Sequence, residues 1–276
     1  MQRAVALSAR RTAAACAAEE RRPPLLLLHG LFGAGNNFRA VTPRLATHGD
    51  VVTADLRNHG SSPWDDDVSL RAMATDVLEL IDDSFDLPPV LCGHSLGGKV
   101  AMVAACLRPA ALRSLIVVDV APFDYSSSAG GPSNLALLQS LVDLPPDVLG
   151  SRADADAALQ SFVPSAGVRQ FLLSNLLPQK RSWRVNLRAI LADWTALSGF
   201  PDDLPPPPPT LRAHFIAGGR SDYLSTPQQR AAASALFPRA TFECIRGAGH
   251  WVHADRPDEF VQALGRVLDG ATPAAG

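Results

Sequence analysis

Two kinds of segment alternate along most of the chain, and they differ in how hydrophobic and polar positions are arranged. Short continuous apolar runs recur, and longer segments with the spacing of an amphipathic helix separate them. A continuous apolar run fits a parallel strand that is buried on both faces of a sheet. The runs predict strands at residues 25–28, 51–54, 90–92, 115–118, 213–217 and 241–244. The intervening segments predict helices at residues 38–47, 69–82, 99–107, 227–236 and 257–268. This order indicates an α/β fold with a mostly parallel sheet flanked by helices.

The pattern changes in the middle of the chain. Residues 122–210 contain no convincing strand, but they contain helical segments at 134–142, 152–162, 168–177 and 187–197. We therefore expect a helical lid at 122–210, inserted into an α/β core made of residues 23–121 and 211–270. An N-terminal segment, 1–22, precedes the core, and a tail, 271–276, follows it.

The N-terminal segment fits two descriptions. It is rich in alanine, contains Arg3, Arg10 and Arg11, and lacks an acidic residue before Glu19. Such a composition is typical of an organellar transit peptide. Val5 and Leu7 also alternate with small residues, as in edge strands, and the sequence alone does not choose between the two. We expect an intracellular protein, mitochondrial or plastid under the first description and otherwise cytoplasmic.

Composition excludes several classes of protein. Hydrophobic residues make up 47% and charged residues 19% of the chain, which are values of a globular domain. A net charge of −2 without a basic stripe argues against nucleic-acid binding. No apolar run is long enough to cross a bilayer. We expect no cofactor and no metal, and free thiols at the four cysteines, which have no CxxC spacing: Cys16, Cys92, Cys106 and Cys244.

Residues 93–97 read Gly-His-Ser-Leu-Gly, a G-x-S-x-G sequence between a predicted strand and a predicted helix. In that context the sequence is typical of a nucleophile elbow, a tight turn that exposes the serine hydroxyl at the carboxyl end of a sheet. Only glycine fits on either side of such a turn. Ser95 is therefore the candidate nucleophile.

A serine nucleophile needs a base to take its proton. His250 lies in a glycine-containing loop after the last predicted strand, where this base is expected. His253 in the same loop is the weaker candidate. His94 is expected to pack beneath the turn, and His29 is expected to orient the loop that follows the first strand.

Two aspartates are candidates for the acid that orients the histidine. Asp222 lies in the loop after the strand at 213–217, which is the usual position of the acid when the chain order is serine, acid, histidine. Asp119 ends the apolar run 115–118, where a carboxylate is costly unless it is paired or belongs to a site. Both preserve the order serine, acid, histidine, so chain order does not separate them.

Other residues have supporting roles. The backbone N–H groups of Leu31 and Leu96 are the expected donors of an oxyanion hole. Phe32 and Trp251 are expected to line the substrate pocket. Lys99 is expected to be a structural ion partner. Three polar residues after the second strand are expected to brace the neighbouring loops: Asp55, Arg57 and Asn58.

Several stretches resemble the α/β-hydrolase fold superfamily. Within it the chain is similar to the YbfF-type bacterial esterases and to the eukaryotic α/β-hydrolase domain-containing protein 11 group. The resemblance runs from about residue 25 to the final helix. It rests on HGLFGAGNNF at 29–38, DLRNHGSSP at 55–63, GHSLGGKVAM at 93–102, VVDVAPFDY at 117–125, WRVNL at 183–187 and GAGHWVHADRP at 247–257.

The resemblance implies that Ser95 and His250 are catalytic and that the chain hydrolyses carboxylic esters or thioesters. It favours Asp119 as the acid, because those relatives often have GGNS and an uncharged residue where this chain has GGRSD. Asp222 departs from that pattern. The relatives include mitochondrial members.

We expect a serine esterase or thioesterase that acts on small to medium acyl substrates through an acyl-enzyme. Its expected partner is therefore a small-molecule acyl ester or thioester. The alternatives are a C–C hydrolase of the same fold and a ligand receptor that retains the residues of the site.

Overall fold

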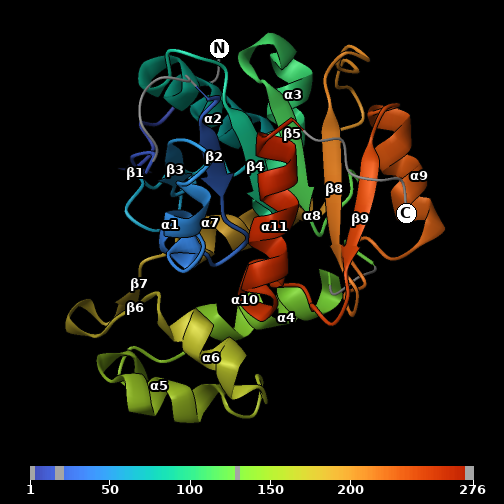
Figure 1. Cartoon of the computed structure of the whole chain (residues 1–276). Helices are drawn as coiled ribbons and strands as arrows, with labels where there is room; N and C mark the ends of the chain where they lie inside the picture. Colours follow the sequence, from blue (N-terminus) through green and yellow to red (C-terminus); the bar gives the residue numbers. More distant parts are fainter. Residues whose placement is uncertain (1–3, 16–21, 128–130, 271–276) are drawn as a thin grey trace.

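The computed structural model describes residues 4–15, 22–127 and 131–270. A seven-stranded sheet in the order β1-β3-β2-β4-β5-β8-β9 runs through the molecule (Figure 1). Its neighbouring strands are parallel, except that β1 is antiparallel to β3. The α/β fold predicted from the sequence is confirmed. The strands are β1 (Ala9–Thr12), β2 (Leu25–Leu28), β3 (Val51–Ala54), β4 (Val90–His94), β5 (Ser114–Val118), β8 (Ala213–Gly218) and β9 (Thr241–Ile245).

The register of the central strands aligns their carboxyl ends. His94 at the end of β4 pairs with Val118 at the end of β5, and Val118 pairs with Ile216 of β8. Because these strands are parallel, the residues that follow them emerge at one edge of the sheet. The turn after β4, the residue after β5 and the loop after β8 therefore meet there.

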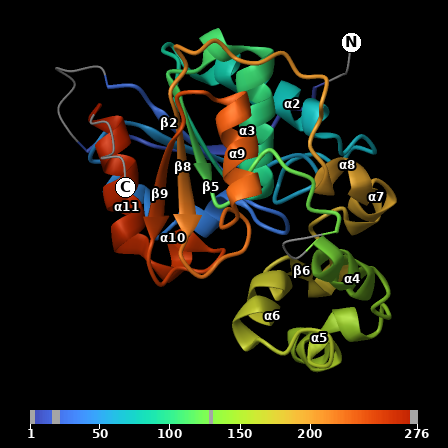
Figure 2. The ribbon, with the colours of Figure 1, turned by 90° about the vertical axis from the view of Figure 1, so that its right-hand side faces the viewer.

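Helices cover both faces of the sheet (Figures 1 and 2). Alternate side chains of β2 enter two separate cores: Leu26 and Leu28 face one, and Leu25 and Leu27 face the other. The first core is covered by α2 (Leu70–Ser84), α3 (Leu96–Leu107) and α9 (Pro227–Leu236). The second is covered by α1 (Thr42–Leu45), α10 (Val252–Asp255) and α11 (Pro257–Leu268).

In the described part of the chain between β5 and β8 there are five α-helices, and we call residues 122–210 the helical segment. Three of these helices, α4, α5 and α6, lie together beyond the carboxyl edge of the sheet (Figures 1 and 2). The five are α4 (Gly131–Val142), α5 (Arg152–Leu159), α6 (Ala166–Leu173), α7 (Leu187–Ala192) and α8 (Trp194–Ser198).

Several predicted elements differ from the structure. The helix predicted at 38–47 is a 3₁₀ turn, η1 (Gly35–Phe38), followed by the single turn of α1. Pro43 explains the break, because proline has no N–H for a helical bond and fits only the first turn. The helix predicted at 187–197 is divided at Asp193, whose backbone is not helical (φ −128°, ψ 43°). The helix predicted at 168–177 is wrong at its end, because α6 ends at Leu173 and β6 (Leu176–Leu177) forms a hairpin with β7 (Ser182–Trp183). Two residues are too few to show an alternation, so no strand was predicted there.

A buried ion pair ties the loop after β3 to α2. Arg57 donates to both carboxylate oxygens of Asp76 at 2.6 Å, and neither residue is more than 1% exposed. The N–H of Val5 donates to the same carboxylate at 2.7 Å, so the N-terminal chain is joined to this pair. Asn58 extends the brace to the helical segment, because its carbonyl accepts from the N–H of Asn186 at 2.9 Å.

The N-terminal segment contributes one edge strand. An edge strand was expected around Val5 and Leu7, but the strand that forms, β1, begins at Ala9 and pairs with all four residues of β3. Cys16 and the predicted tail at 271–276 lie outside the described residues. No helix of the described chain is long and apolar enough to span a membrane.

Candidate active site

Ser95 occupies the tight turn between β4 and α3. Its backbone has a positive φ (52°), a conformation that residues with a side chain rarely adopt. The turn leaves no room for side chains at its glycines. A Cβ on Gly93 would lie 2.1 Å from the carbonyl oxygen of Gly97, and a Cβ on Gly97 would lie 2.6 Å from the carbonyl oxygen of Leu28. The turn therefore requires glycine on both sides of Ser95.

His250 joins Ser95 to Asp119. Its Nε2 lies 2.9 Å from Ser95 Oγ, and its Nδ1 lies 2.7 Å from Asp119 Oδ2. Because an ionised carboxylate only accepts hydrogen bonds, Nδ1 carries the proton and Nε2 is left as an acceptor. The arrangement can take a proton from the serine hydroxyl and stabilise the imidazolium that results.

Asp119 follows β5 in a left-handed conformation (φ 55°) and is completely buried. Its Oδ1 accepts from the N–H of Gly218 at 2.8 Å. Its Oδ2 accepts from the hydroxyl of Ser221 as well as from His250. Both oxygens are thus satisfied by donors from the end of β8 and from the loops after β8 and β9, and these bonds fix the direction of the carboxylate.

The second candidate acid lies elsewhere. Asp222 is exposed, and its carbonyl, not its carboxylate, accepts from the side chain of Gln229 at 2.8 Å. Of the two aspartates proposed from the sequence, the structure brings Asp119 to His250 and leaves Asp222 on the outside of the turn.

The turn at Gly30–Gly33 packs against the serine. The N–H of Gly33 donates to the carbonyl of Gly30 at 2.9 Å, and Phe32 within the turn has a φ of 60°. A Cβ on Gly30 would lie 3.2 Å from Ser95 Cβ, so the backbone here is in close contact with the serine. Leu31 lies in this turn, and Leu96 follows Ser95 at the start of α3.

Three further histidines surround the site in neutral form. Burial lowers the pKa of His29 and of His253 to about 4, and it lowers the pKa of His94 well below its ordinary value. His94 Nε2 donates to the carbonyl of His250 at 2.7 Å and so supports the loop of the candidate base. His29 Nε2 accepts from the N–H of Leu56 at 3.0 Å. The ring of His253 packs between Phe38 and His94, with ring centroids 4.8 and 5.0 Å away.

A cavity of about 230 Å³ opens onto Ser95 and His250. Phe32 and Trp251, proposed from the sequence as pocket residues, both line it, as do Leu137 of α4 and Phe171 of α6. A smaller cavity of about 50 Å³ adjoins Ser95 on the side of α8. A third cavity, of about 420 Å³, shares Phe171 and Trp251 with the first. The helical segment therefore forms one wall of the space beside the serine.

Lys99 does not form the ion pair expected of it. Its Nζ is buried and donates to the carbonyls of Leu197, Ser198 and Gly199 at 3.2, 2.6 and 2.8 Å. No carboxylate of the described chain lies within ion-pair distance. Burial lowers the pKa of Lys99 to about 7, against a smaller opposing effect of Asp124. Lys99 thus fastens the nucleophile helix to the carboxyl end of α8.

Several residues of the site carry no signal in the sequence. Tyr223 stacks on His250, and its carbonyl accepts from the hydroxyl of Tyr125. Asn175 in the helical segment donates to the carbonyl of Phe32 at 2.7 Å and so supports the turn beside Ser95. The contacts of Tyr223 with Tyr125 and of Asn175 with Phe32 join residues roughly a hundred positions apart or more, which a local pattern does not reveal.

No group of three or more histidine, cysteine, aspartate or glutamate residues in the described chain is arranged to hold a metal ion. Cys92, Cys106 and Cys244 are free, and Cys244, expected in a core strand, is exposed.

Comparison with known proteins covers most of the chain. A family model, described as the alpha/beta hydrolase family, matches residues 25–263. The sn-1-specific diacylglycerol lipase ABHD11 of Mus musculus is 38% identical over 248 residues, which cover 87% of this chain and 79% of the lipase. Esterase YbfF of Escherichia coli (strain K12) is 32% identical over 243 residues, which cover 88% of this chain and 92% of the esterase.

Solved structures give the same picture. A marine microorganism esterase superposes with a TM-score of 0.87 at 30% identity, covering 95% of this chain and 98% of the esterase. An E-2-(acetamidomethylene)succinate hydrolase superposes with a TM-score of 0.74 at 21% identity, which is a likeness in fold alone.

Proposed function

The chain belongs to the alpha/beta hydrolase family, and we propose that it hydrolyses carboxylic esters with Ser95 as nucleophile, His250 as base and Asp119 as orienting acid. One observation carries the proposal. The hydroxyl, the imidazole and the buried carboxylate form an unbroken series of hydrogen bonds at 2.9 and 2.7 Å. The esterase and lipase names of the relatives point to the same bond.

The proposed reaction has two halves. Ser95 Oγ attacks the acyl carbon while its proton passes to His250 Nε2, and that proton then goes to the leaving alkoxide as the ester C–O bond breaks. A water molecule next attacks the acyl-enzyme, gives a proton to His250, and releases the carboxylic acid as Ser95 recovers its proton. Asp119 orients His250 and stabilises the imidazolium in both halves.

Negative charge develops on the acyl oxygen in each half and needs fixed donors. We assign this role to the N–H groups of Leu31 and Leu96. The carbonyl of His29 accepts from the N–H of Gly97 at 3.1 Å, and this bond holds the turn that contains Leu31 against the elbow that contains Leu96.

The cavity beside Ser95 supports an acyl group of small to medium size. Its volume is about 230 Å³, and its lining includes the apolar side chains of Leu31, Phe32, Leu137, Phe171 and Trp251. A thioester presents the same acyl carbon with a better leaving group, so we include thioesters among the proposed substrates.

Activity-based labelling tests the proposal. A fluorophosphonate should label the wild-type protein and not Ser95→Ala, while both proteins melt at similar temperatures. The protein should turn over p-nitrophenyl esters or acyl thioesters repeatedly. These substrates should compete with the label, and a panel of them should rank acyl lengths. Persistent labelling of folded Ser95→Ala would refute the assignment of the nucleophile. Labelling without turnover on any ester or thioester would favour a ligand receptor or a C–C hydrolase.

The N-terminal residues pose a separate question about location. Strand β1 pairs along β3, and Val5 is bonded to Asp76. These contacts favour the edge-strand interpretation, and we propose that residues 4–15 stay with the folded enzyme. The N-terminal sequence of the protein purified from its own cells tests this, because cleavage near residue 22 would indicate a transit peptide and an organellar location.

A further inference from the structure

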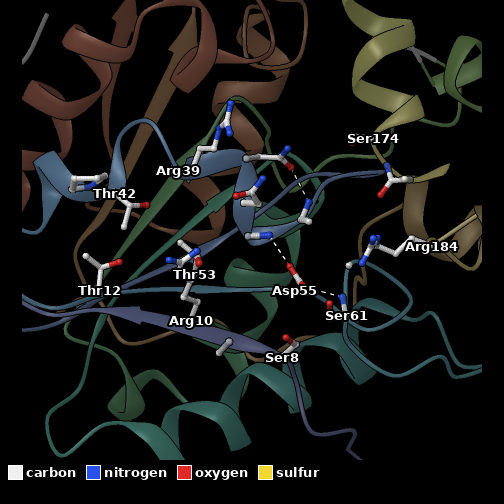
Figure 3. A pocket seen from close by; sticks show the side chains of 18 residues that line it. Ser8, Arg10, Thr12, Arg39, Thr42, Thr53, Asp55, Ser61, Ser174 and Arg184 are labelled. Carbon is white, nitrogen blue, oxygen red and sulfur yellow. Dashed lines mark hydrogen bonds between the residues drawn. The ribbon is translucent and has the colours of Figure 1, made fainter. Parts of the chain in front are cut away.

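A second large cavity lies away from the serine. Its volume is about 500 Å³, and it is an open pocket lined by residues of β1, of the chain around η1, and of the helical segment near β6 and β7 (Figure 3). Neither Ser95 nor His250 lines it. Hydroxyl groups are frequent in its wall, among them those of Ser8, Thr12 and Ser61.

Three arginines from different parts of the chain line this cavity. Arg10 comes from β1, Arg39 from the residue after η1, and Arg184 from the residue after β7 (Figure 3). None of the three guanidinium groups forms a hydrogen bond or ion pair within the described chain. Several arginines elsewhere pair with carboxylates, although other exposed arginines of the described chain, such as Arg113 and Arg188, do not. Arg44 contacts Asp258 at 2.7 Å and Arg108 contacts Asp82 at 2.6 Å.

The only acidic residue in the described lining is Asp55, and its carboxylate is occupied. Its Oδ1 accepts from the N–H of Gly35 at 2.7 Å, and its Oδ2 accepts from the N–H of Ser61 at 2.8 Å. Three arginines against one aspartate leave an excess of positive charge. A concave wall with an excess of one sign of charge concentrates ions of the opposite sign.

We propose that this cavity binds the phosphate group of a small phosphomonoester. A phosphomonoester carries close to two negative charges at neutral pH, so it needs more than one cation. One guanidinium group can donate two parallel hydrogen bonds to two phosphate oxygens, and hydroxyl groups can donate the remaining hydrogen bonds. Three unpaired guanidinium groups beside several hydroxyls supply both kinds of donor.

The cavity adjoins the proposed catalytic site without being part of it. Asn37 lines both this cavity and the 420 Å³ cavity that shares Phe171 and Trp251 with the catalytic one. Asn175 lines it and bonds to the carbonyl of Phe32. The phosphate therefore belongs either to a substrate that reaches from the serine or to a separate ligand.

Titration calorimetry with glycerol 3-phosphate, inorganic phosphate and glycerol tests the proposal. Both phosphates should bind with a single saturable site, and glycerol should not. Arg10→Ala, Arg39→Ala and Arg184→Ala should each weaken binding by about tenfold, the effect of losing one charge-assisted hydrogen bond. Arg188→Ala and Arg113→Ala remove exposed arginines outside the cavity and should leave the affinity unchanged.

Absence of saturable binding to the wild-type protein would overturn the proposal, and so would an equal loss in the two control variants. The three lining side chains have no partners to lose, so their variants should fold, and melting temperatures check this. Ser95→Ala should bind phosphate like the wild type, which keeps this test independent of the proposed reaction.

Kinetics then identify the source of the phosphate. If the substrate carries it, Arg184→Ala should raise KM for an acyl glycerol phosphate and not for the matching acyl glycerol. If a separate ligand carries it, Arg184→Ala should affect both esters alike, and glycerol 3-phosphate should not compete with either of them.

Discussion

The ring of Tyr223 stacks on the imidazole of His250, with centroids 4.1 Å apart and planes inclined by 26°. The hydroxyl of Tyr125 donates to the carbonyl of Tyr223 and accepts from the N–H of Ala121 at 2.9 Å. One face of the imidazole therefore packs against a tyrosine whose backbone is anchored to the residues after β5. This contact and the bond from Nδ1 to Asp119 hold the imidazole with Nε2 toward Ser95.

The two histidines of the last loop should differ sharply in their effect on turnover. His250→Ala removes the proposed base and should lower kcat by about a million-fold. His253→Ala removes a neutral ring that packs between Phe38 and His94, and its kcat should stay within the order of magnitude of the wild type. Steady-state kinetics on a p-nitrophenyl ester measure both. An inactive His253→Ala beside an active His250→Ala would show that the base has been misassigned.

The two aspartates provide a similar matched pair. Asp119→Asn leaves the shape of the site but favours the wrong tautomer of His250, so kcat should fall roughly ten-thousand-fold. Asp222→Asn changes an exposed side chain and should have little effect. Circular dichroism should first establish that both variants are folded. The assignment of Asp119 fails if Asp222→Asn is the variant that loses activity.

The pH dependence of stability should reveal Lys99. Burial lowers its pKa from 10.5 to about 7 in the folded protein. Between these values the unfolded chain holds a proton that the folded chain has released, so this group makes the folded state more stable as pH rises. Lys99→Met removes the titration. The free energy of unfolding of the wild type, relative to this variant, should therefore increase between pH 7 and 10, by up to about 1.4 kcal/mol per pH unit.

Urea denaturation at several pH values measures this difference. Lys180→Met is the matched control, because Lys180 is exposed, and its difference from the wild type should stay flat. A flat or falling difference for Lys99→Met would contradict the prediction.

The buried pair of Arg57 and Asp76 should be costly to break. Asp76→Ala leaves a buried guanidinium without its carboxylate and should reduce the free energy of unfolding by about 3–5 kcal/mol. The double variant with Arg57→Met and Asp76→Leu should recover much of that loss, because it buries no charge. Asp82→Ala breaks the exposed pair with Arg108 and should cost less than about 1 kcal/mol. A cost for Asp76→Ala as small as that of Asp82→Ala would contradict the argument.

The sequence predicted the buried elements of the fold well. Strands β2 and β3 and helices α9 and α11 have their predicted bounds, because a buried parallel strand is a continuous apolar run and these helices begin at proline. The elements it missed are short or are interrupted locally. The α1 region is shaped by Pro43 and by the bond from Thr42 to the carbonyl of Phe38, and the β6–β7 hairpin is too short for a periodicity.

Some residues of the candidate site could be predicted from local sequence patterns, and others could not. Ser95 and His250 stand in local sequence patterns that predict their positions, whereas the choice between Asp119 and Asp222 depends on which loop reaches the imidazole. The sequence favoured Asp119 only through the family resemblance and its place after an apolar run, because the bonds that orient this carboxylate, from Ser221 and Gly218, cross between strands. Lys99 was misjudged because backbone carbonyls, its actual partners, leave no trace in a sequence.

Phe32, Ser95 and Asp119 are three of the five non-glycine residues with a positive φ in the described chain. A side chain in such a conformation costs about 1–3 kcal/mol, and glycine at the same position does not carry that cost. Resistance to heat and catalytic competence are thus opposed at these positions. Directed evolution that selects for thermal stability alone would favour glycine in place of Ser95, and the most stable variants would be catalytically inactive.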